Sequence, residues 1–192
     1  MTLSIILLQL MKGMGVTAEI FFLTLLFSLP LGLLVAFGRM SKNGIIRMIS
    51  KIYISVLRGT PLMLQLIVVY FAPFYVFHLK VGNYRFPAII IAFALNYAAY
   101  FAEIYRSGIE AVPKGQYEAA AVLGYSRTQT FVRIIFPQMV KIVLPPVTNE
   151  VITLVKDTSL AFALAYTEMF TLAKQVAATN ASIMPLFVAG VF

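Results

Sequence analysis

The chain has 192 residues, of which 61% are hydrophobic and only 11% charged, whereas about 25% of a typical soluble domain is charged. It contains no cysteine and one histidine, which excludes disulfide scaffolds, thiolate metal sites and histidine clusters. We therefore expect neither a metal nor a cofactor on this chain. A net charge of +8 would suggest nucleic acid as the partner of a soluble protein. In a membrane protein it first indicates a bias of basic residues toward the cytoplasm, and no nucleic acid is expected.

Five apolar segments predict an all-α integral membrane protein with about five transmembrane helices, because about 20 apolar residues span a bilayer. The first three, residues 20–37, 59–77 and 86–102, are uncharged. The fourth, residues 137–164, carries four charged residues, and the fifth, residues 175–192, is still apolar at the last residue. We expect a single domain over residues 1–192 whose last helix is incomplete. Residues 1–15 predict an interfacial helix that leads into the first span.

Basic residues gather in two stretches, one after the first span and one after the third. Together these stretches hold ten of the 15 basic residues: Arg39, Lys42, Arg47, Lys51 and Arg58 in one, and Arg106, Lys114, Arg127, Arg133 and Lys141 in the other. Both stretches are therefore expected in the cytoplasm, which places the N-terminus outside a multi-pass protein.

The stretch from Arg106 to Pro137 has the pattern of a structured loop. Helix-forming residues run from 116 to 123, and Gly124 suits the left-handed position that ends a helix. Ser126 is then a candidate N-cap for a second helix, which Pro137 is expected to end or kink. The sequence predicts two short helices joined by a turn, and an ordinary amphipathic helix on the membrane surface is the alternative.

The same loop resembles the Glu-Ala-Ala loop of the membrane subunits of bacterial ABC importers. Glu118, Ala119 and Ala120 are followed by Gly124 and then Ile134 at the spacing of that motif, with Phe136 where leucine is usual. The segments 57–62 (LRGTPL) and 156–160 (KDTSL) further resemble the polar amino acid permeases, the group that takes up histidine, glutamine and arginine.

This resemblance implies a type I importer fold in the bacterial cytoplasmic membrane, with residues Glu118, Ala119, Ala120 and Gly124 on a cytoplasmic coupling helix. That helix would sit in a groove of a separate ATP-binding subunit, which binds the ATP and Mg²⁺, since this chain has no phosphate-binding loop of its own. The other implied partners are an extracytoplasmic substrate-binding protein and a second permease subunit, either a second copy in a homodimer or a sister chain.

Polar residues interrupt two of the apolar segments at helical spacing, and such residues within a membrane are candidates for function. Asn96, Tyr100 and Glu103 share one face of the third predicted helix, together with Ser107. Glu150, Thr153 and Asp157 share a face of the fourth. The candidate substrate-binding residues are therefore Asn96, Tyr100, Glu103, Glu150, Thr153 and Asp157.

Structural roles remain open for several of these residues. Asn96 and Tyr100 could hold helices together, Glu103 could pair with Arg106, and Lys156 could neutralise Asp157. Arg58 is interpreted as a structural residue at the cytoplasmic end of the second span.

Three acids in or near the bundle favour a cationic amino acid (arginine, lysine or histidine) as the substrate, with glutamine or another polar amino acid as the alternative. A small channel or a secondary carrier fits less well, because neither a self-contained pore nor an inverted repeat is visible. A membrane enzyme would need a catalytic constellation that the sequence does not offer.

Overall fold

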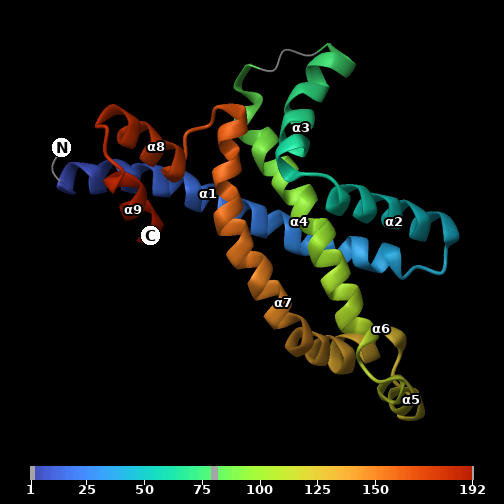
Figure 1. The fold of residues 1–192 in the computed structure, drawn as a ribbon. Helices are drawn as coiled ribbons and strands as arrows, with labels where there is room; N and C mark the ends of the chain where they lie inside the picture. The colour runs from blue at the N-terminus through green and yellow to red at the C-terminus, as the bar shows by residue number, and fades with distance from the viewer. Residues whose placement is uncertain (1–2, 79–81, 192) are drawn as a thin grey trace. The chain divides into compact units, whose positions relative to one another are not determined.

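The computed structural model describes residues 3–78 and 82–191, and in this part of the chain it contains helices and no strand (Figure 1). The expected all-α fold is confirmed. The main helices in chain order are α1 (Leu3–Arg39), α2 (Gly44–Gly59), α3 (Leu62–Phe77), α4 (Arg85–Glu110), α5 (Lys114–Val122), α6 (Arg127–Thr130), α7 (Phe136–Asp157), α8 (Met169–Thr179) and α9 (Met184–Val191). Three shorter turns complete them: the 3₁₀ helices η1 (Gly82–Tyr84) and η3 (Thr158–Leu164), and the π-helix η2 (Phe131–Ile135).

Three continuous helical stretches among the described residues are long and apolar enough to cross a membrane: 4–39, 85–110 and 127–164. A fourth candidate is the pair α2 and α3, which meet at a bend of 114°. These stretches include the first, third and fourth predicted spans, and α3 covers most of the second.

The segment predicted to lead into the first span is continuous with it, because α1 runs without interruption for 37 residues. Gly13 stands within this helix, where glycine costs only about 1 kcal/mol relative to alanine, too little to end a long helix. It also permits a close contact: a Cβ at Gly13 would lie 2.6 Å from the Cα of Met169 in α8. A Cβ at Gly15 would meet nothing within 4 Å.

The basic stretch after the first span is helical over Gly44–Gly59, which the sequence analysis did not predict. An Asx-type turn precedes it, in which Asn43 Oδ1 accepts a hydrogen bond from the backbone N–H of Ile45 at 2.9 Å. The fifth predicted span is also different. A turn in which Ala181 has a φ of 46° divides it into α8 and α9, so residues 175–191 do not form one continuous helix.

Of the two alternatives predicted for Pro137, an end of the helix or a kink, the first does not occur. The π-helix η2 precedes it directly, and the wider turn leads into α7 without a break. The side chain of Gln138 donates to the carbonyl of Ile134 at 2.9 Å, which supplies a hydrogen bond at this irregular turn. Ser126 caps α6 as predicted, in a capping box with Gln129, and Gly124 adopts the predicted left-handed conformation with a φ of 75°.

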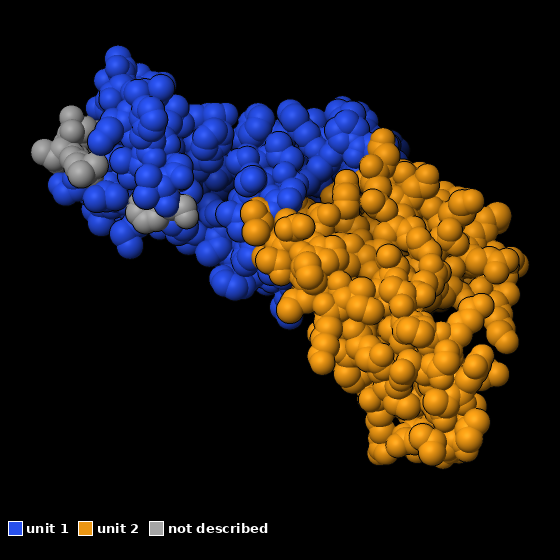
Figure 2. Space-filling model, turned by 60° about the horizontal axis from the view of Figure 1, so that its bottom comes forward, with its two compact units in different colours: residues 1–26, 60–94, 153–192 blue, residues 27–59, 95–152 orange. Residues whose placement is uncertain are grey.

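The chain divides into two compact units, which Figure 2 colours separately. Unit 1 comprises residues 1–26, 60–94 and 153–192, and unit 2 comprises residues 27–59 and 95–152. In unit 1 the first half of α1 packs against α8 and α9 around Leu10, Ala173 and Ala189. Thr17 Oγ1 accepts a hydrogen bond from the N–H of Met169 in the same region. The single domain expected from the sequence stays a prediction.

Unit 2 has two apolar clusters that fix α4 in place. Ala36 of α1, Ile54 of α2 and Ala99 of α4 form one of them, where small side chains let three helices approach closely. The second joins Ile109 of α4 to Ile135 and Met139 beside it. Together they hold the polar face of α4 next to α2 and α7.

Candidate functional site

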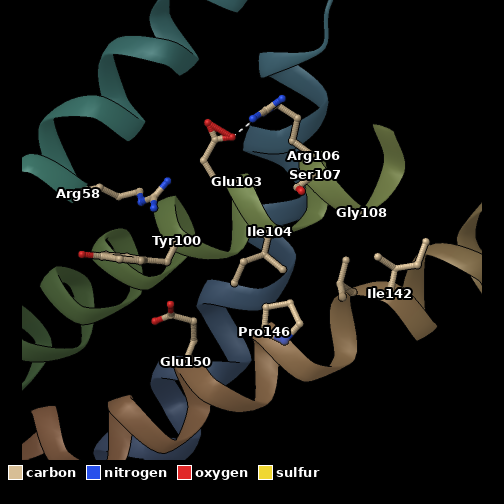
Figure 3. Close-up of a pocket in the computed structure, with 11 residues that line it drawn as sticks. Arg58, Tyr100, Glu103, Ile104, Arg106, Ser107, Gly108, Ile142, Pro146 and Glu150 are labelled. Atoms are coloured by element: carbon tan, nitrogen blue, oxygen red, sulfur yellow. Dashed lines mark hydrogen bonds and ion pairs between the residues drawn. The ribbon is translucent and has the colours of Figure 1, made fainter. Parts of the chain in front are cut away.

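A cavity of about 410 Å³ lies in unit 2 between the end of α2, the second half of α4 and the middle of α7 (Figure 3). Its polar lining comes from four charged residues, one tyrosine and one serine: Arg58, Glu103, Arg106, Glu150, Tyr100 and Ser107. Apolar groups such as Ile104 and Ile142 complete the wall. Both helices that face each other across the cavity qualify as membrane spans, so charged groups are concentrated here in an otherwise apolar setting.

Arg106 is engaged by two carboxylates of its own helix. Its Nε atom donates to Glu103 Oε2 and its Nη1 atom donates to Glu110 Oε2, both at 2.5 Å. Glu110 is 55% exposed, whereas Glu103 is 22% exposed and lines the cavity. The two acids outnumber their arginine, so this ion-pair cluster carries a net negative charge. The alternative in which Glu103 pairs with Arg106 is therefore realised.

Arg58 and Glu150 bring opposite charges into the same cavity from different helices. The guanidinium of Arg58 lies 5.1 Å from the ring centroid of Tyr100, within the range of a cation–π interaction. Figure 3 shows Glu150 reaching into the cavity from α7, on the other side of Tyr100 from Arg58. An arginine is suited to hold a carboxylate, and a glutamate to hold an ammonium group. The cavity therefore offers both halves of an amino acid zwitterion a complementary partner.

Pro146 adds a backbone feature to this wall. It has no N–H with which to bond the carbonyl of Ile142 one turn earlier, and both residues line the cavity. Two residues later, Thr148 donates its hydroxyl to the carbonyl of Leu144 at 2.8 Å.

Asn96 is 4% exposed and donates a hydrogen bond from Nδ2 to the carbonyl of Leu57 at 3.1 Å. Leu57 directly precedes Arg58. Asn96 therefore fastens α4 to the segment that carries Arg58, and Tyr53 does the same from α2 through a 2.6 Å bond to the carbonyl of Leu95. The expected role of Asn96 in holding helices together is present in the structure.

Thr153 and Asp157 follow Glu150 on α7 at the predicted spacing, so the three residues lie along one face of that helix. Both belong to unit 1, whereas the cavity is formed within unit 2. Of the six predicted substrate-binding residues, the structure thus brings Tyr100, Glu103 and Glu150 together around one cavity.

The predicted coupling segment forms α5, a nine-residue helix whose outer surface is accessible. Glu118 and Ala119 are exposed, whereas Ala120 is completely buried and packs within the chain. Ala120 can therefore shape the helix's position but cannot touch a partner. Gln116 is tied to α7, because the side chain of Gln138 donates a 3.3 Å hydrogen bond to it. Burial raises the pKa of the Tyr117 hydroxyl above its ordinary value, so this hydroxyl stays protonated.

Two apolar side chains at the end of α5 are highly exposed. Val122 is 89% exposed and Leu123 is 72% exposed. In the sequence they belong to a helix-forming run, and no partner was predicted for them. The signal was present, because they are bulky apolar residues immediately before a glycine turn in a polar loop, where their own chain offers no core.

The family model described as "Binding-protein-dependent transport system inner membrane component" matches residues 28–192. The chain belongs to this family.

Proteins that are similar over most of this chain are named as permeases of amino acid transport systems. The L-cystine transport system permease protein TcyB of Bacillus subtilis is 39% identical over 88% of this chain and 70% of its own length. The putative glutamine transport system permease protein GlnP of Rickettsia felis is 36% identical over 95% of this chain and 83% of its own. The predicted resemblance to the permeases of amino-acid ABC importers is confirmed.

Solved structures agree with the fold. The crystal structure of an amino acid ABC transporter with histidines superposes with a TM-score of 0.84 at 30% identity, over 95% of this chain and 85% of the solved one. The MetNI methionine ABC transporter in an inward-facing conformation superposes with a TM-score of 0.69 at 17% identity and supports the fold alone. The chain is thus a multi-pass permease of the type I importer class.

Within this permease, sequence reasoning missed Arg58 as a site residue. It was interpreted as a topological signal at the end of a span, because a single cation in a basic stretch is usually explained that way. Instead, the bonds from Asn96 to the carbonyl of Leu57 and from Tyr53 to the carbonyl of Leu95 hold the end of α2 against α4, where the guanidinium of Arg58 lies over the ring of Tyr100.

Proposed function

We propose that this permease forms the membrane path of an ATP-driven importer for a polar, cationic amino acid such as arginine, lysine or histidine. The observation that carries the proposal is the cavity in which Glu150 and Glu103 meet Arg58. We assign Arg58 to the α-carboxylate, Glu150 to the cationic side chain, and Tyr100 to orienting Arg58. Glu103, which also lines the cavity, is assigned to the α-ammonium group. The crystallised amino acid ABC transporter with histidines supports this choice.

Thr153 and Asp157 are proposed to continue the polar path along α7, and Asn96 is proposed to position Arg58. The path is completed by a second permease subunit, for which a second copy of this chain is our proposal. The N-terminus is placed on the outer face of the cytoplasmic membrane, where an extracytoplasmic binding protein delivers the substrate.

ATP and Mg²⁺ are proposed to bind a separate ATP-binding subunit that docks on α5. The contact is assigned to Glu118 and Ala119 together with Val122 and Leu123, while Gly124 and Ala120 set the helix's geometry. This short helix, which is anchored to α7 through Gln138, can transmit motion of the ATPase to a helix that lines the cavity.

Glutamine is the second candidate substrate, because several Rickettsia relatives are named as putative glutamine permeases. A neutral zwitterion would use Arg58 and Glu103 and would leave Glu150 without a cation to bind. The two candidates therefore differ in whether the carboxylate of Glu150 contributes to uptake.

Uptake in proteoliposomes tests the proposal. The permease, its ATP-binding subunit and its binding protein are reconstituted, and ATP-dependent accumulation of labelled arginine, lysine, histidine and glutamine is compared at equal concentration. We expect the cationic amino acids to accumulate at least about tenfold faster than glutamine, corresponding to about 1.4 kcal/mol. Accumulation of glutamine with none of arginine would establish the second candidate instead, and accumulation independent of ATP would overturn the importer.

A further inference from the structure

A second cavity in unit 2, of about 340 Å³, is lined by apolar residues and shares only Val143 with the charged cavity described above. It lies between the second half of α1 and the first half of α7. Leu29 and Leu33 form one side, and Val140, Leu144 and Val147 form the other. Among the residues that line this groove, the hydroxyl of Tyr105 is the only polar side-chain group.

The groove lies at membrane depth. Both bordering helices belong to stretches that are long and apolar enough to span a bilayer. Leu33 stands six residues before Arg39, the last residue of α1, so the groove begins about 9 Å along the helix from that end. Leu144 is 59% exposed and Val140 is 37% exposed, so the groove is open toward the surroundings of the bundle.

Positive charge surrounds the near end of this groove. Arg39 ends α1, Arg133 lies one turn before α7, and Lys141 is exposed beside Val140. The rings of Phe37 and Phe131 meet at 5.3 Å, which brings the end of α1 next to η2. Residues 27–58 and 127–149 contain eight lysines and arginines and no aspartate or glutamate.

We propose that this groove binds an anionic phospholipid. One acyl chain occupies the apolar groove, and the headgroup phosphate lies against Arg39, Arg133 and Lys141. Basic pockets between membrane helices at the cytoplasmic side recognise acidic headgroups in this way, and each cation near the surface contributes about 1 kcal/mol.

The charge pattern also decides between lipid and protein as the occupant. If a second copy of this chain covered the groove, it would bury three cations. Because burying unpaired charge is costly, the covering surface would need acidic residues that pair with them. The stretches of α1 and α7 that line the groove, residues 29–33 and 136–147, contain no acid that could pair with these cations in a symmetric copy. A phospholipid supplies the negative charge and the apolar chain in one molecule.

The absence of tryptophan from the chain makes the proposal testable by fluorescence. Leu144→Trp places a reporter in the groove, and Leu34→Trp places a matched one on α1, where Leu34 is 67% exposed and does not line the groove. Each variant is assembled with its partner subunits in phosphatidylcholine bilayers. Emission is measured relative to the unsubstituted assembly as brominated phosphatidylglycerol or brominated phosphatidylcholine is added.

We expect brominated phosphatidylglycerol to quench Leu144→Trp at a mole fraction about tenfold lower than brominated phosphatidylcholine. Arg133→Gln combined with Lys141→Gln should remove this preference, and Leu34→Trp should show none. Equal quenching of Leu144→Trp by the two lipids would overturn the proposal in favour of unselective lipid contact. Quenching by neither would show that protein covers the groove and would overturn it as well.

A second measurement does not depend on any substitution. Native mass spectrometry of the unsubstituted assembly, purified from a membrane that contains both lipids, should detect retained phosphatidylglycerol in preference to zwitterionic lipid. Equal retention of the two lipid classes would contradict the proposal.

Discussion

Replacing Glu150 with glutamine should lower the uptake of arginine about tenfold to a hundredfold while glutamine uptake falls less. The carboxylate reaches into the cavity opposite Arg58, and a charge-assisted hydrogen bond to a cation contributes about 1.5–3 kcal/mol that a neutral amide does not replace. The measurement is the ratio of kcat/KM for the two substrates in proteoliposomes. Because the glutamine side chain that replaces Glu150 has nearly the same shape as glutamate, assembly with the ATP-binding subunit should persist.

Glu110→Gln is the matched control for this substitution. Glu110 also carries negative charge in unit 2, but it does not line the cavity. Its side chain, which forms an ion pair with Arg106, is 55% exposed. Exposed ion pairs contribute only about 0–1 kcal/mol, so substrate preference should change little. Equal loss of arginine and glutamine uptake in Glu150→Gln would show that this residue serves structure and not selectivity.

Replacing Leu123 with aspartate should uncouple the permease from ATP hydrolysis. The side chain is 72% exposed at the tip of α5, next to Val122, and in the proposed assembly it enters an apolar contact with the ATPase. A charge buried in such a contact without a partner weakens association by several kcal/mol, and each 1.4 kcal/mol is a tenfold loss. We expect substrate-stimulated ATPase activity and uptake to fall together by at least about tenfold.

Val132→Asp provides the control for the coupling surface. Val132 is an apolar residue of the same loop, 56% exposed, and lies on η2 instead of α5. Its substitution should leave stimulated ATPase activity within about twofold. Full substrate-stimulated ATPase activity in Leu123→Asp would show that the ATP-binding subunit does not dock at the end of α5.

Local signals in the sequence were sufficient for the first, third and fourth predicted spans and for the cap and turn of the coupling loop. Continuous apolar runs require helices because backbone groups in lipid must bond internally. Ser126 and Gly124 specify their cap and turn by residue chemistry alone, and the structure confirms both. The spacing of Tyr100 and Glu103 placed them on one face of α4, which is the face that lines the cavity.

Features that depend on tertiary contacts could not be predicted in the same way. The close approach that Gly13 permits depends on a helix more than 150 residues later in the chain. α2 was overlooked because its charges suggested a loop, although Ile45, Ile49, Ile52 and Val56 recur at helical spacing. Arg58 lies beside Tyr100 because α2 is bonded to α4 through Tyr53 and Asn96, and contacts between residues about 40 positions apart are not encoded in composition.

The proposed function requires that the cavity beside Tyr100 lies on the transport path of the substrate. Substrate protection of a single engineered cysteine tests this requirement. The chain contains no cysteine, so Ser107→Cys places one thiol in the cavity lining, and Ser55→Cys places a control on α2 outside it. The assembly is labelled with a membrane-impermeant maleimide in the presence and absence of saturating arginine. We predict that arginine slows labelling of Ser107→Cys several-fold and leaves Ser55→Cys unchanged. An identical rate at Ser107→Cys with and without transported substrate would contradict the account.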